Sequence, residues 1–256
     1  MTYKFQTPAI FLIGPTASGK TETSLRLAEE FPLEIISVDS AMVFKEMNIG
    51  TCKPSLQNLE NVPHHLIDIL QPDAEFDVGI FIRYVDSAIQ TIIQNKKIPL
   101  FVGGTMMFHK VLLDGIHDFP RDDSLREEID QIRRNKGYQL LLNELKLLDP
   151  ETFQLIDKKN PRRVQRALEI IKLTKTKLSL LKKEPSKKFL NSENCLILGM
   201  NDSKNNLDIS VEKRLRSIIE DGLVNELEKL INTYKLTSES HSMNSINYKQ
   251  FFPYVE

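Results

Sequence analysis

The sequence has 256 residues and a formal net charge of −1, which allow one large domain with a sizeable core, or one domain carrying an insertion. Its cysteines, Cys52 and Cys195, cannot build a disulfide framework, and neither stands beside a metal-binding partner. No stretch approaches the roughly 18 apolar residues of a membrane span, and no secretory signal pattern precedes the first apolar run. We therefore expect a cytoplasmic protein that is neither exported nor inserted into a membrane.

The first predicted element is the apolar run Ala9–Ile13, which has the composition of a buried strand, and Glu22–Glu30 has the pattern of a helix. The segment between them has the spacing of a P-loop: Gly14, Pro15, Thr16, Ala17, Ser18, Gly19, Lys20 and Thr21. In such a loop, backbone N–H groups surround a diphosphate at a helix N-terminus, the lysine faces phosphate oxygens, and the last hydroxyl can ligate Mg2+. We predict that residues 14–21 bind a diphosphate, with Thr21 as a metal ligand.

Two further apolar runs, Glu34–Val38 and Ile98–Val102, also predict buried parallel strands. Helical patterns alternate with them, notably Val78–Gln94, so the predicted fold class is α/β, a parallel sheet flanked by helices. The two strands end at Asp39-Ser40 and at Gly103-Gly104-Thr105. Because ligands of such sheets bind at the carboxyl ends of the strands, we expect both groups and the P-loop to meet at one pocket.

Beyond Leu113 the sequence changes to charged helical segments without a strand pattern between them, which predicts a helical insertion. The predicted parts are the first part of a P-loop core at 1–113, a helical insertion at 114–190 and the second part of the core at 191–256. The helices expected in the insertion are Ser124–Arg134, Tyr138–Leu148, Pro150–Asp157 and Arg162–Thr174. In the second part of the core we expect a strand at Cys195–Met200 and a helix at Asn206–Asn232.

Charge is segregated along the chain, since residues 157–188 hold twelve Lys or Arg against three Asp or Glu. In the helix expected at 162–174, one apolar stripe faces inward, formed by Val164, Ala167, Leu168 and Ile171. Three arginines then occupy other faces: Arg162, Arg163 and Arg166. Such a surface suits a polyanion, because phosphate contacts depend on local charge. A solvated helix followed by a flexible lysine-rich loop would have the same composition.

Several segments, taken in order, closely resemble the tRNA dimethylallyltransferases, P-loop prenyltransferases that modify an adenosine beside the anticodon. The resemblance covers nearly the whole chain and includes the P-loop. Its other segments are Ser37–Pro54, Pro63–Ile69, Pro99–Thr105, Asn160–Glu169, Val211–Arg214 and Gly222-Leu223.

The resemblance implies transfer of a dimethylallyl group from dimethylallyl diphosphate to the exocyclic amine of adenosine 37 in a tRNA anticodon stem-loop, with Mg2+ as cofactor. It aligns Asp39 with the family's catalytic aspartate. A carboxylate there suits the chemistry, because the amine is a poor nucleophile and loses a proton. Thr105, Lys20 and Arg214 are implied to stabilise the departing diphosphate. We expect a monomer that contacts tRNA through Asp39, Ser40, Met42, Phe44, Arg162, Arg163 and Arg166.

Individual positions also have plainer interpretations. Asp39 would suit a helix cap or water-mediated support of Mg2+, and Gly103-Gly104-Thr105 would suit a tight turn. His64, His65 and Asp68 are close in sequence, but adjacent histidines point apart and no third ligand has suitable spacing. We therefore expect them to line a loop or substrate channel. The P-loop alone also fits a small-molecule or nucleotide kinase that binds ATP.

The sequence departs from the family pattern at several positions. Ser210 stands where an arginine four residues before Arg214 is usual, and Asn247 replaces the usual glycine before a tyrosine. Met42 and Phe44 stand where glutamine and tyrosine are frequent. Family members also continue through a basic helical segment beyond the length of this chain. A tRNA-binding remnant without catalysis is therefore another hypothesis.

Overall fold

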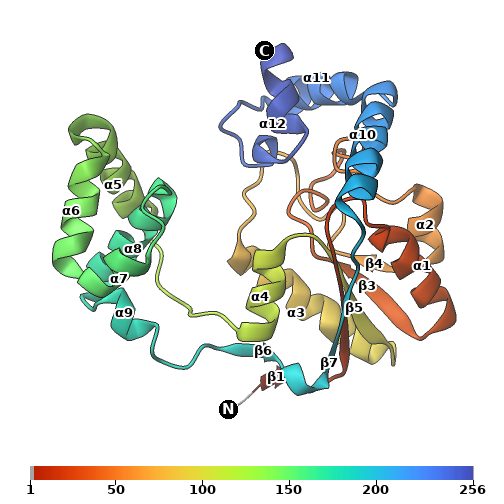
Figure 1. Cartoon of the computed structure of the whole chain (residues 1–256), viewed down its shortest axis with the longest axis horizontal. Coiled ribbons are helices and arrows are strands. Elements are labelled where there is room, and N and C mark those ends of the chain that lie inside the picture. Colours follow the sequence, from red (N-terminus) through yellow and green to blue (C-terminus); the bar gives the residue numbers. More distant parts are fainter. Residues whose placement is uncertain (1–2, 256) are drawn as a thin grey trace. The chain divides into compact units, whose positions relative to one another are not determined.

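The computed structural model describes residues 3–255, and the chain divides into two compact units (Figure 1). The larger unit combines Met1–Leu113 with Phe189–Glu256, and the smaller unit is Asp114–Lys188. The predicted insertion, 114–190, starts at the same residue as the smaller unit and extends past its end. Within residues 3–255, no helix is long and apolar enough to cross a membrane.

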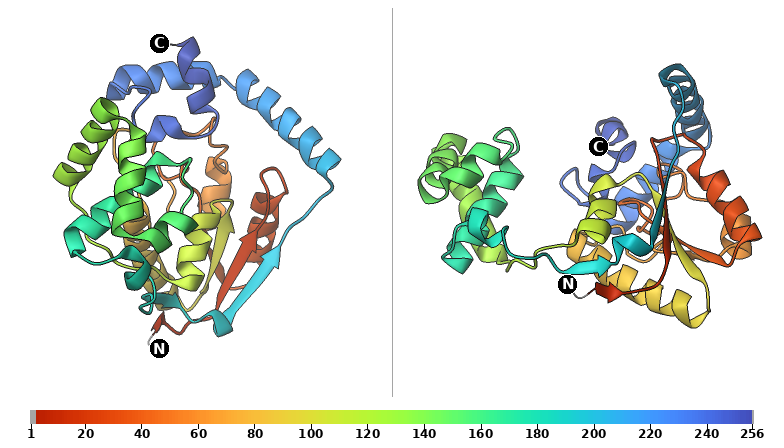
Figure 2. Two further views of the ribbon diagram at one scale, coloured as in Figure 1. Left: turned by 60° about the vertical axis from the view of Figure 1, so that its left-hand side comes forward. Right: turned by 60° about the horizontal axis from the view of Figure 1, so that its bottom comes forward.

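The larger unit is built on a five-stranded sheet in which all neighbouring strands are parallel. The spatial order is β4-β3-β5-β2-β7, and β7 forms an edge beside β2 (Figure 2). The strands are β2 Ala9–Ile13, β3 Leu33–Ser37, β4 His64–His65, β5 Ile98–Gly103 and β7 Cys195–Gly199. The α/β prediction is confirmed, and four strands begin and end within one residue of the expected positions. The fifth, β4, is too short to carry a periodic signal.

Helices and short turns connect and cover these strands. The helices of the larger unit are α1 Lys20–Glu30, α2 Leu56–Asn61, α3 Val78–Gln94, α4 Met106–Asp114, α10 Lys204–Glu220, α11 Leu223–Tyr234 and α12 Tyr248–Phe251. The 3-10 turns are η1 Ser192–Asn194, η2 Ser242–Asn244 and η3 Phe252–Tyr254. A separate two-stranded sheet pairs β1 Tyr3–Phe5 with β6 Lys188–Leu190.

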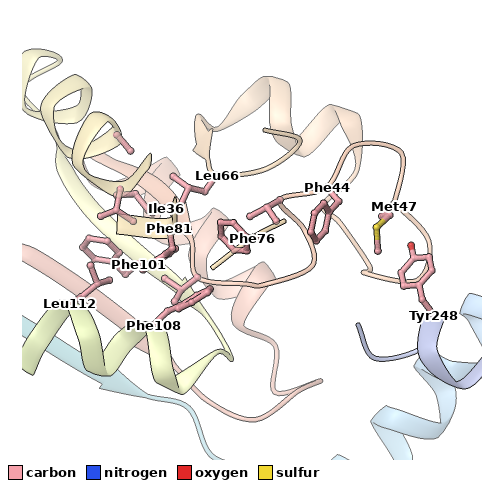
Figure 3. Close-up of a cluster of buried hydrophobic side chains, with 14 of the residues drawn as sticks. Ile36, Phe44, Met47, Leu66, Phe76, Phe81, Phe101, Phe108, Leu112 and Tyr248 are labelled. Carbon is pink, nitrogen blue, oxygen red and sulfur yellow. The ribbon is translucent and has the colours of Figure 1, made fainter. Parts of the chain in front are cut away.

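Successive side chains of each strand point to opposite faces of the sheet, which gives the larger unit three layers. On one face, Phe101 of β5 belongs to a core completed by Phe81 of α3 and Phe108 of α4 (Figure 3). The rings of Phe81 and Phe108 are stacked, with 4.1 Å between centroids. On the other face, Leu12 and Leu100 belong to a second core to which α1 contributes. The near-continuous apolar composition of the strands follows from burial on both faces.

The single helix expected at Asn206–Asn232 is wrong, because two helices, α10 and α11, occupy this stretch. Gly222, between them, has φ 98°, a left-handed backbone that favours glycine and ends a helix. The chain therefore turns after α10, and buried side chains of both helices belong to the same core.

The smaller unit is helical and has its own apolar core. Its helices are α5 Asp123–Lys136, α6 Tyr138–Leu148, α7 Pro150–Leu155, α8 Pro161–Thr174 and α9 Leu178–Leu181. The stripe predicted on α8 is confirmed, since all four of its side chains are buried. Three N-cap side chains, Asp122, Asp149 and Asn160, accept hydrogen bonds from backbone N–H groups at the starts of α5, α7 and α8.

Candidate active site

The P-loop forms the turn between the end of β2 and the start of α1. Ala17 (φ 64°) and Gly19 (φ 81°) have left-handed backbone, which bends the loop around its own centre. The Lys20 ammonium donates hydrogen bonds to the carbonyl oxygens of Gly14 and Pro15, at 2.9 and 2.6 Å. The lysine is thus held across the loop at the N-terminal end of α1, where helix N–H groups favour an anion.

Two further observations at the P-loop are consistent with an anion site. The Ser18 hydroxyl oxygen is buried and has no hydrogen-bond partner among residues 3–255, which is unfavourable until a ligand atom pairs with it. Burial lowers the pKa of Lys20, the nearby Arg214 charge lowers it further, and Asp39 opposes both. An anion placed between Lys20 and Arg214 would relieve the repulsion of these cations.

A cavity of about 390 Å3 lies where the carboxyl ends of the strands meet, within the size range of small-ligand sites. Its walls include P-loop residues 16–21, Asp39 after β3, Gly103 and Gly104 at the end of β5, and Arg214 of α10. The segments that the sequence placed at three strand ends therefore border one cavity. Met42 and His64 also line it.

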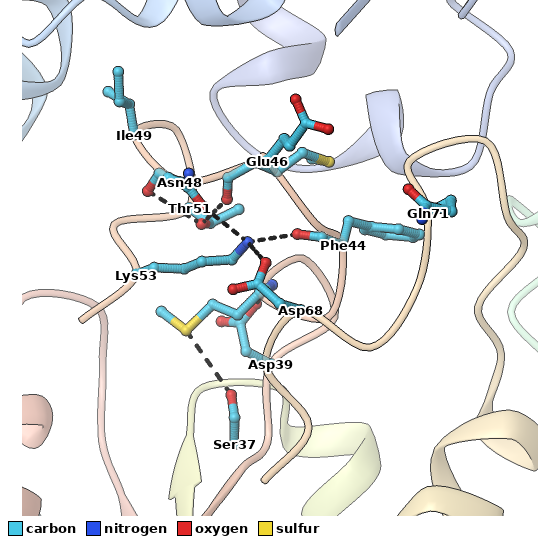
Figure 4. Close-up of polar contacts among 12 residues, drawn as sticks. Ser37, Asp39, Phe44, Glu46, Asn48, Ile49, Thr51, Lys53, Asp68 and Gln71 are labelled. Carbon is cyan, nitrogen blue, oxygen red and sulfur yellow. Dashed lines mark hydrogen bonds and ion pairs between the residues drawn. The ribbon is translucent and has the colours of Figure 1, made fainter. Parts of the chain in front are cut away.

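Asp39 is partly exposed and uses one of its two carboxylate oxygens in the turn that follows β3. Its Oδ1 accepts hydrogen bonds from the backbone N–H groups of Ala41 and Met42, at 2.8 and 3.1 Å. Its Oδ2 has no hydrogen-bond partner among the residues that the structure describes, and the side chain lines the cavity (Figure 4). Asp39 does not cap a helix, because no helix begins in the described residues between β3 and α2. It caps the turn that follows β3, and this leaves one carboxylate oxygen for chemistry.

Gly103 is needed because β3 and β5 approach closely at their ends. The Val38 N–H donates to the Val102 carbonyl at 2.7 Å, and the Thr105 N–H donates to the Val38 carbonyl at 3.3 Å. A Cβ atom on Gly103 would overlap the Val38 backbone. Thr105 then starts α4, where its carbonyl accepts from Phe108 N–H at 2.9 Å, and it is not among the residues that line the cavity.

Three other residues after β3 were expected to contact tRNA: Ser40, Met42 and Phe44. The structure gives them different surroundings. Met42 lines the cavity, and its sulfur accepts a hydrogen bond from the Ser37 hydroxyl at 3.8 Å. Ser40 is exposed next to it. Phe44 is fully buried in the core and contacts Phe76 edge-on, so its ring faces protein and not a ligand surface.

Lys53, which the sequence did not single out, joins several segments beside Asp39. Its ammonium donates to the Asp68 carboxylate at 2.6 Å, to the Phe44 carbonyl at 2.5 Å and to the Asn48 side chain at 3.2 Å (Figure 4). The side chain is only 4% exposed. Burial lowers the pKa of Lys53, while Asp68 and, more weakly, Asp39 raise it. Short-range sequence patterns carry no sign of such a bridge.

Arg214 lines both this cavity and an adjoining groove of about 1020 Å3. Its Nε atom donates to the Cys52 sulfur at 2.9 Å. Ser210 lies one helical turn earlier on α10 and lines the adjoining groove as well. The position at which an arginine was expected therefore faces the groove, and a serine leaves that space open.

The three candidate arginines of α8 lie in the smaller unit and differ in their surroundings. Arg162 and Arg163 are exposed. Arg166 donates to the Pro120 carbonyl and pairs with the buried Glu169 carboxylate, both at 2.8 Å. Burial opposes ionisation of Glu169, but hydrogen bonds from Arg126 and Arg166 hold its pKa below the ordinary value. Arg166 therefore stabilises the fold of this unit.

The histidines considered as metal ligands have other partners. His64 donates through Nδ1 to the Val62 carbonyl at 2.7 Å, and His65 Nε2 lies 2.8 Å from a Glu34 carboxylate oxygen. No cluster of three or more His, Cys, Asp or Glu suited to a metal occurs within residues 3–255. The Thr21 hydroxyl and the Asp39 carboxylate do line one cavity, and Mg2+ takes few protein oxygens when substrate phosphates supply the rest. This donor set fits Mg2+.

A family model described as IPP transferase matches residues 42–256, which is most of the chain. The chain belongs to this family. It is 39% identical over 248 residues to tRNA dimethylallyltransferase 2 of Geotalea uraniireducens, covering 96% of this chain and 79% of that protein. It is 37% identical over 246 residues to the tRNA dimethylallyltransferase of Francisella tularensis subsp. novicida, covering 96% and 80%.

Solved structures of the IPP transferase family are also similar to this chain. The full-length tRNA isopentenylpyrophosphate transferase of Bacillus halodurans superposes with a TM-score of 0.66 at 32% identity, covering 98% of this chain and 78% of that one. A eukaryotic dimethylallyltransferase acting on tRNA gives a TM-score of 0.84 at 29% identity, covering 98% and 63%. The family and the α/β fold expected from the sequence are thus confirmed.

Proposed function

We propose that this member of the IPP transferase family transfers the dimethylallyl group of dimethylallyl diphosphate to the exocyclic amine of adenosine 37 in tRNA. The observation that carries the proposal is one cavity that joins a P-loop to the free oxygen of Asp39. Relatives named as tRNA dimethylallyltransferases match 96% of the chain, which supports the same activity here. A kinase needs the P-loop but does not account for these relatives.

The proposed reaction is a substitution at the first carbon of the allyl group. A bond forms between that carbon and the adenine nitrogen, the bond from the carbon to the diphosphate oxygen breaks, and diphosphate leaves with the bonding pair. The amine proton passes to the free Oδ2 of Asp39, which acts as general base. Residues 14–21 bind the diphosphate through backbone N–H groups, and Lys20 and Arg214, which line the cavity, stabilise its developing charge. The resemblance assigns Thr105 the same role, although Thr105 is not among the residues that line the cavity.

Mg2+ fits this proposal as the ion bound with the diphosphate, and Thr21 is the proposed protein ligand. When bound, Mg2+ neutralises diphosphate charge and so favours its departure. Lys20 would exchange its present contacts with Gly14 and Pro15 for phosphate oxygens, because a charged acceptor makes the stronger hydrogen bond.

For the tRNA we propose two groups of contacts. The target base would leave its stack in the anticodon loop and enter the cavity beside Asp39, Ser40 and Met42. The stem would be held through phosphates by Arg162 and Arg163, which are exposed. Arg166 and Phe44 would act indirectly, the first by supporting α8 and the second from within the core. We further propose that the enzyme is a cytoplasmic monomer.

The test is transfer of labelled dimethylallyl groups from their diphosphate to unmodified tRNA with adenosine at position 37, in the presence of Mg2+. Labelled tRNA from the wild type, and none from tRNA carrying guanosine at that position, is the expected result. Measurable binding of diphosphate and tRNA without transfer would favour the remnant hypothesis. ATP-dependent phosphoryl transfer without labelling would favour the kinase.

A further inference from the structure

The loop 47–53 is held by the last part of the larger unit through contacts that the proposed chemistry does not use. The Glu226 carboxylate of α11 accepts hydrogen bonds from three successive backbone N–H groups: Asn48 at 2.9 Å, Ile49 at 2.8 Å and Gly50 at 3.2 Å. Successive N–H groups of this kind form an anion-binding concavity, here filled by the protein's own carboxylate. The same carboxylate accepts the Tyr248 hydroxyl at 2.5 Å.

The packing around this carboxylate is equally specific. Tyr248 is fully buried, and its ring occupies the space where a Cβ atom on Gly50 would lie, only 2.6 Å from ring carbons. Burial and the Glu226 charge raise the pKa of Tyr248 well above its ordinary value, so the hydroxyl remains a donor. A glycine at position 50 is therefore what allows the tyrosine to reach Glu226.

Asn247 completes the contacts on Gly50. Its side-chain N–H group donates to the Gly50 carbonyl at 2.7 Å, so both backbone polar atoms of Gly50 are bound by side chains from residues 226–247. Asn247 has φ 75°, a strained conformation for a residue with a side chain. This explains why glycine suits the position, and it shows that asparagine supplies a hydrogen bond that glycine lacks.

The contacts on residues 48–50 also affect the cavity, because hydrogen bonds within the loop 47–53 hold its residues together. The Thr51 hydroxyl donates to the Met47 carbonyl at 2.5 Å, and the Lys53 N–H donates to the Asn48 carbonyl at 3.1 Å. The far side of the loop carries Cys52, which contacts Arg214 at 2.9 Å. Pro54, the residue that follows the loop, lines the P-loop cavity together with that arginine.

We propose that Glu226, Asn247 and Tyr248 form a clamp that positions the loop 47–53, and through it Arg214, for the diphosphate. The three residues are positioning residues, since they act on the cavity through the loop and touch no reacting atom. This inference rests on the proposed function, because it assigns the clamp an effect on the prenyl donor.

Tyr248→Phe tests the clamp, because it keeps the buried ring and removes one donor to Glu226. We expect the KM for dimethylallyl diphosphate and the Kd for inorganic diphosphate to rise about ten-fold, since a displaced binding group loses affinity. The KM for tRNA should change less than about two-fold, and the amides of residues 48–50 should exchange hydrogen faster. The control, Tyr138→Phe, removes a 2.8 Å hydrogen bond to the Lys158 carbonyl in the smaller unit. It should leave all donor readouts unchanged.

The outcomes separate the clamp from the proposed function. A wild type that transfers no prenyl group overturns the proposed function, and diphosphate affinity and amide exchange still test the clamp. Unchanged donor KM, diphosphate Kd and amide exchange in Tyr248→Phe overturn the clamp, even if the melting temperature falls. If Tyr248→Phe does not fold, Asn247→Ala removes another contact of the clamp and is judged by the same measurements.

Discussion

Replacing Asp39 by asparagine and by alanine separates a catalytic base from a structural cap. Asn retains a side-chain oxygen that can accept the N–H groups of Ala41 and Met42, which Oδ1 binds at 2.8 and 3.1 Å. It replaces the free Oδ2 by an amide that takes no proton. Asp39→Asn should therefore fold like the wild type and lose catalysis, whereas Asp39→Ala should lose both the cap and catalysis.

The magnitudes follow from these contacts. Removing a general base lowers a rate by about 10²- to 10⁴-fold, which is about 2.7 to 5.4 kcal/mol of barrier. Two backbone hydrogen bonds at about 0.5 to 1.5 kcal/mol each make Asp39→Ala about 1 to 3 kcal/mol less stable. Asp39→Asn should change the free energy of unfolding by less than about 1 kcal/mol, because its cap survives.

The assay is single-turnover labelling of tRNA with saturating donor and Mg2+, run beside urea denaturation of each variant. Single turnover isolates the chemical step from product release. If Asp39→Asn labels tRNA within about five-fold of the wild-type rate while Asp39→Ala is unstable, Asp39 is a cap and the base lies elsewhere. Equal rate losses in both variants support the base.

Three further predictions rest on single contacts. Lys20→Met should raise the Kd for inorganic diphosphate by about ten-fold or more in calorimetry, because a charged donor is lost; an unchanged Kd would place the anion elsewhere. Gly103→Ala should lower the free energy of unfolding by about 1 to 3 kcal/mol in urea, because its Cβ would overlap the Val38 backbone; wild-type stability would show that the strand ends separate easily. Glu169→Gln should lower the free energy of unfolding by about 2 kcal/mol near neutral pH. This is less than the loss expected for a fully buried ion pair, because the arginine partners of Glu169 are partly exposed. The pKa of Glu169 is lower in the folded protein than in the unfolded chain. As pH falls, the unfolded chain therefore takes up the proton before the folded protein does. The stabilising effect of the carboxylate is lost as pH falls below the ordinary value of 4.5. The difference in melting temperature between wild type and Glu169→Gln should therefore shrink in acid, and a constant difference down to about pH 3 would contradict the assignment.

The sequence predicted those parts of the fold that depend on local patterns. The apolar runs located four strands, and the P-loop spacing located the turn that starts α1, because composition and spacing are set by neighbours in the chain. The break between α10 and α11 was missed although Asp221-Gly222 offered a turn signal inside a long helical pattern. The strand β4 has only two residues, which is too short for an apolar strand pattern.

The candidate site was predictable only in part, for a related reason. Strand topology brings Asp39 and Gly103 to the P-loop cavity, as expected from their places after apolar runs. The bridge made by Lys53 and the contacts of Glu226 join residues far apart in the chain, so no spacing rule indicates them. The burial of Phe44 likewise results from tertiary packing with Phe76 and not from its neighbours in sequence.

The place of β2 between β5 and β7 has a consequence for how the chain folds as it is synthesised. Residues 10–13 of β2 pair on one side with residues 100–103. On the other side residues 9–13 pair with residues 195–199, which are made only after the whole smaller unit. The helices of that unit rely on nearby contacts and should fold early, whereas the β2–β7 pairing closes a long loop and should form late. Until then one edge of the strand that carries the P-loop stays unpaired. A nascent chain stalled before residue 195 should therefore bind a chaperone that recognises exposed strands, and a chain released after residue 199 is out of the tunnel should not.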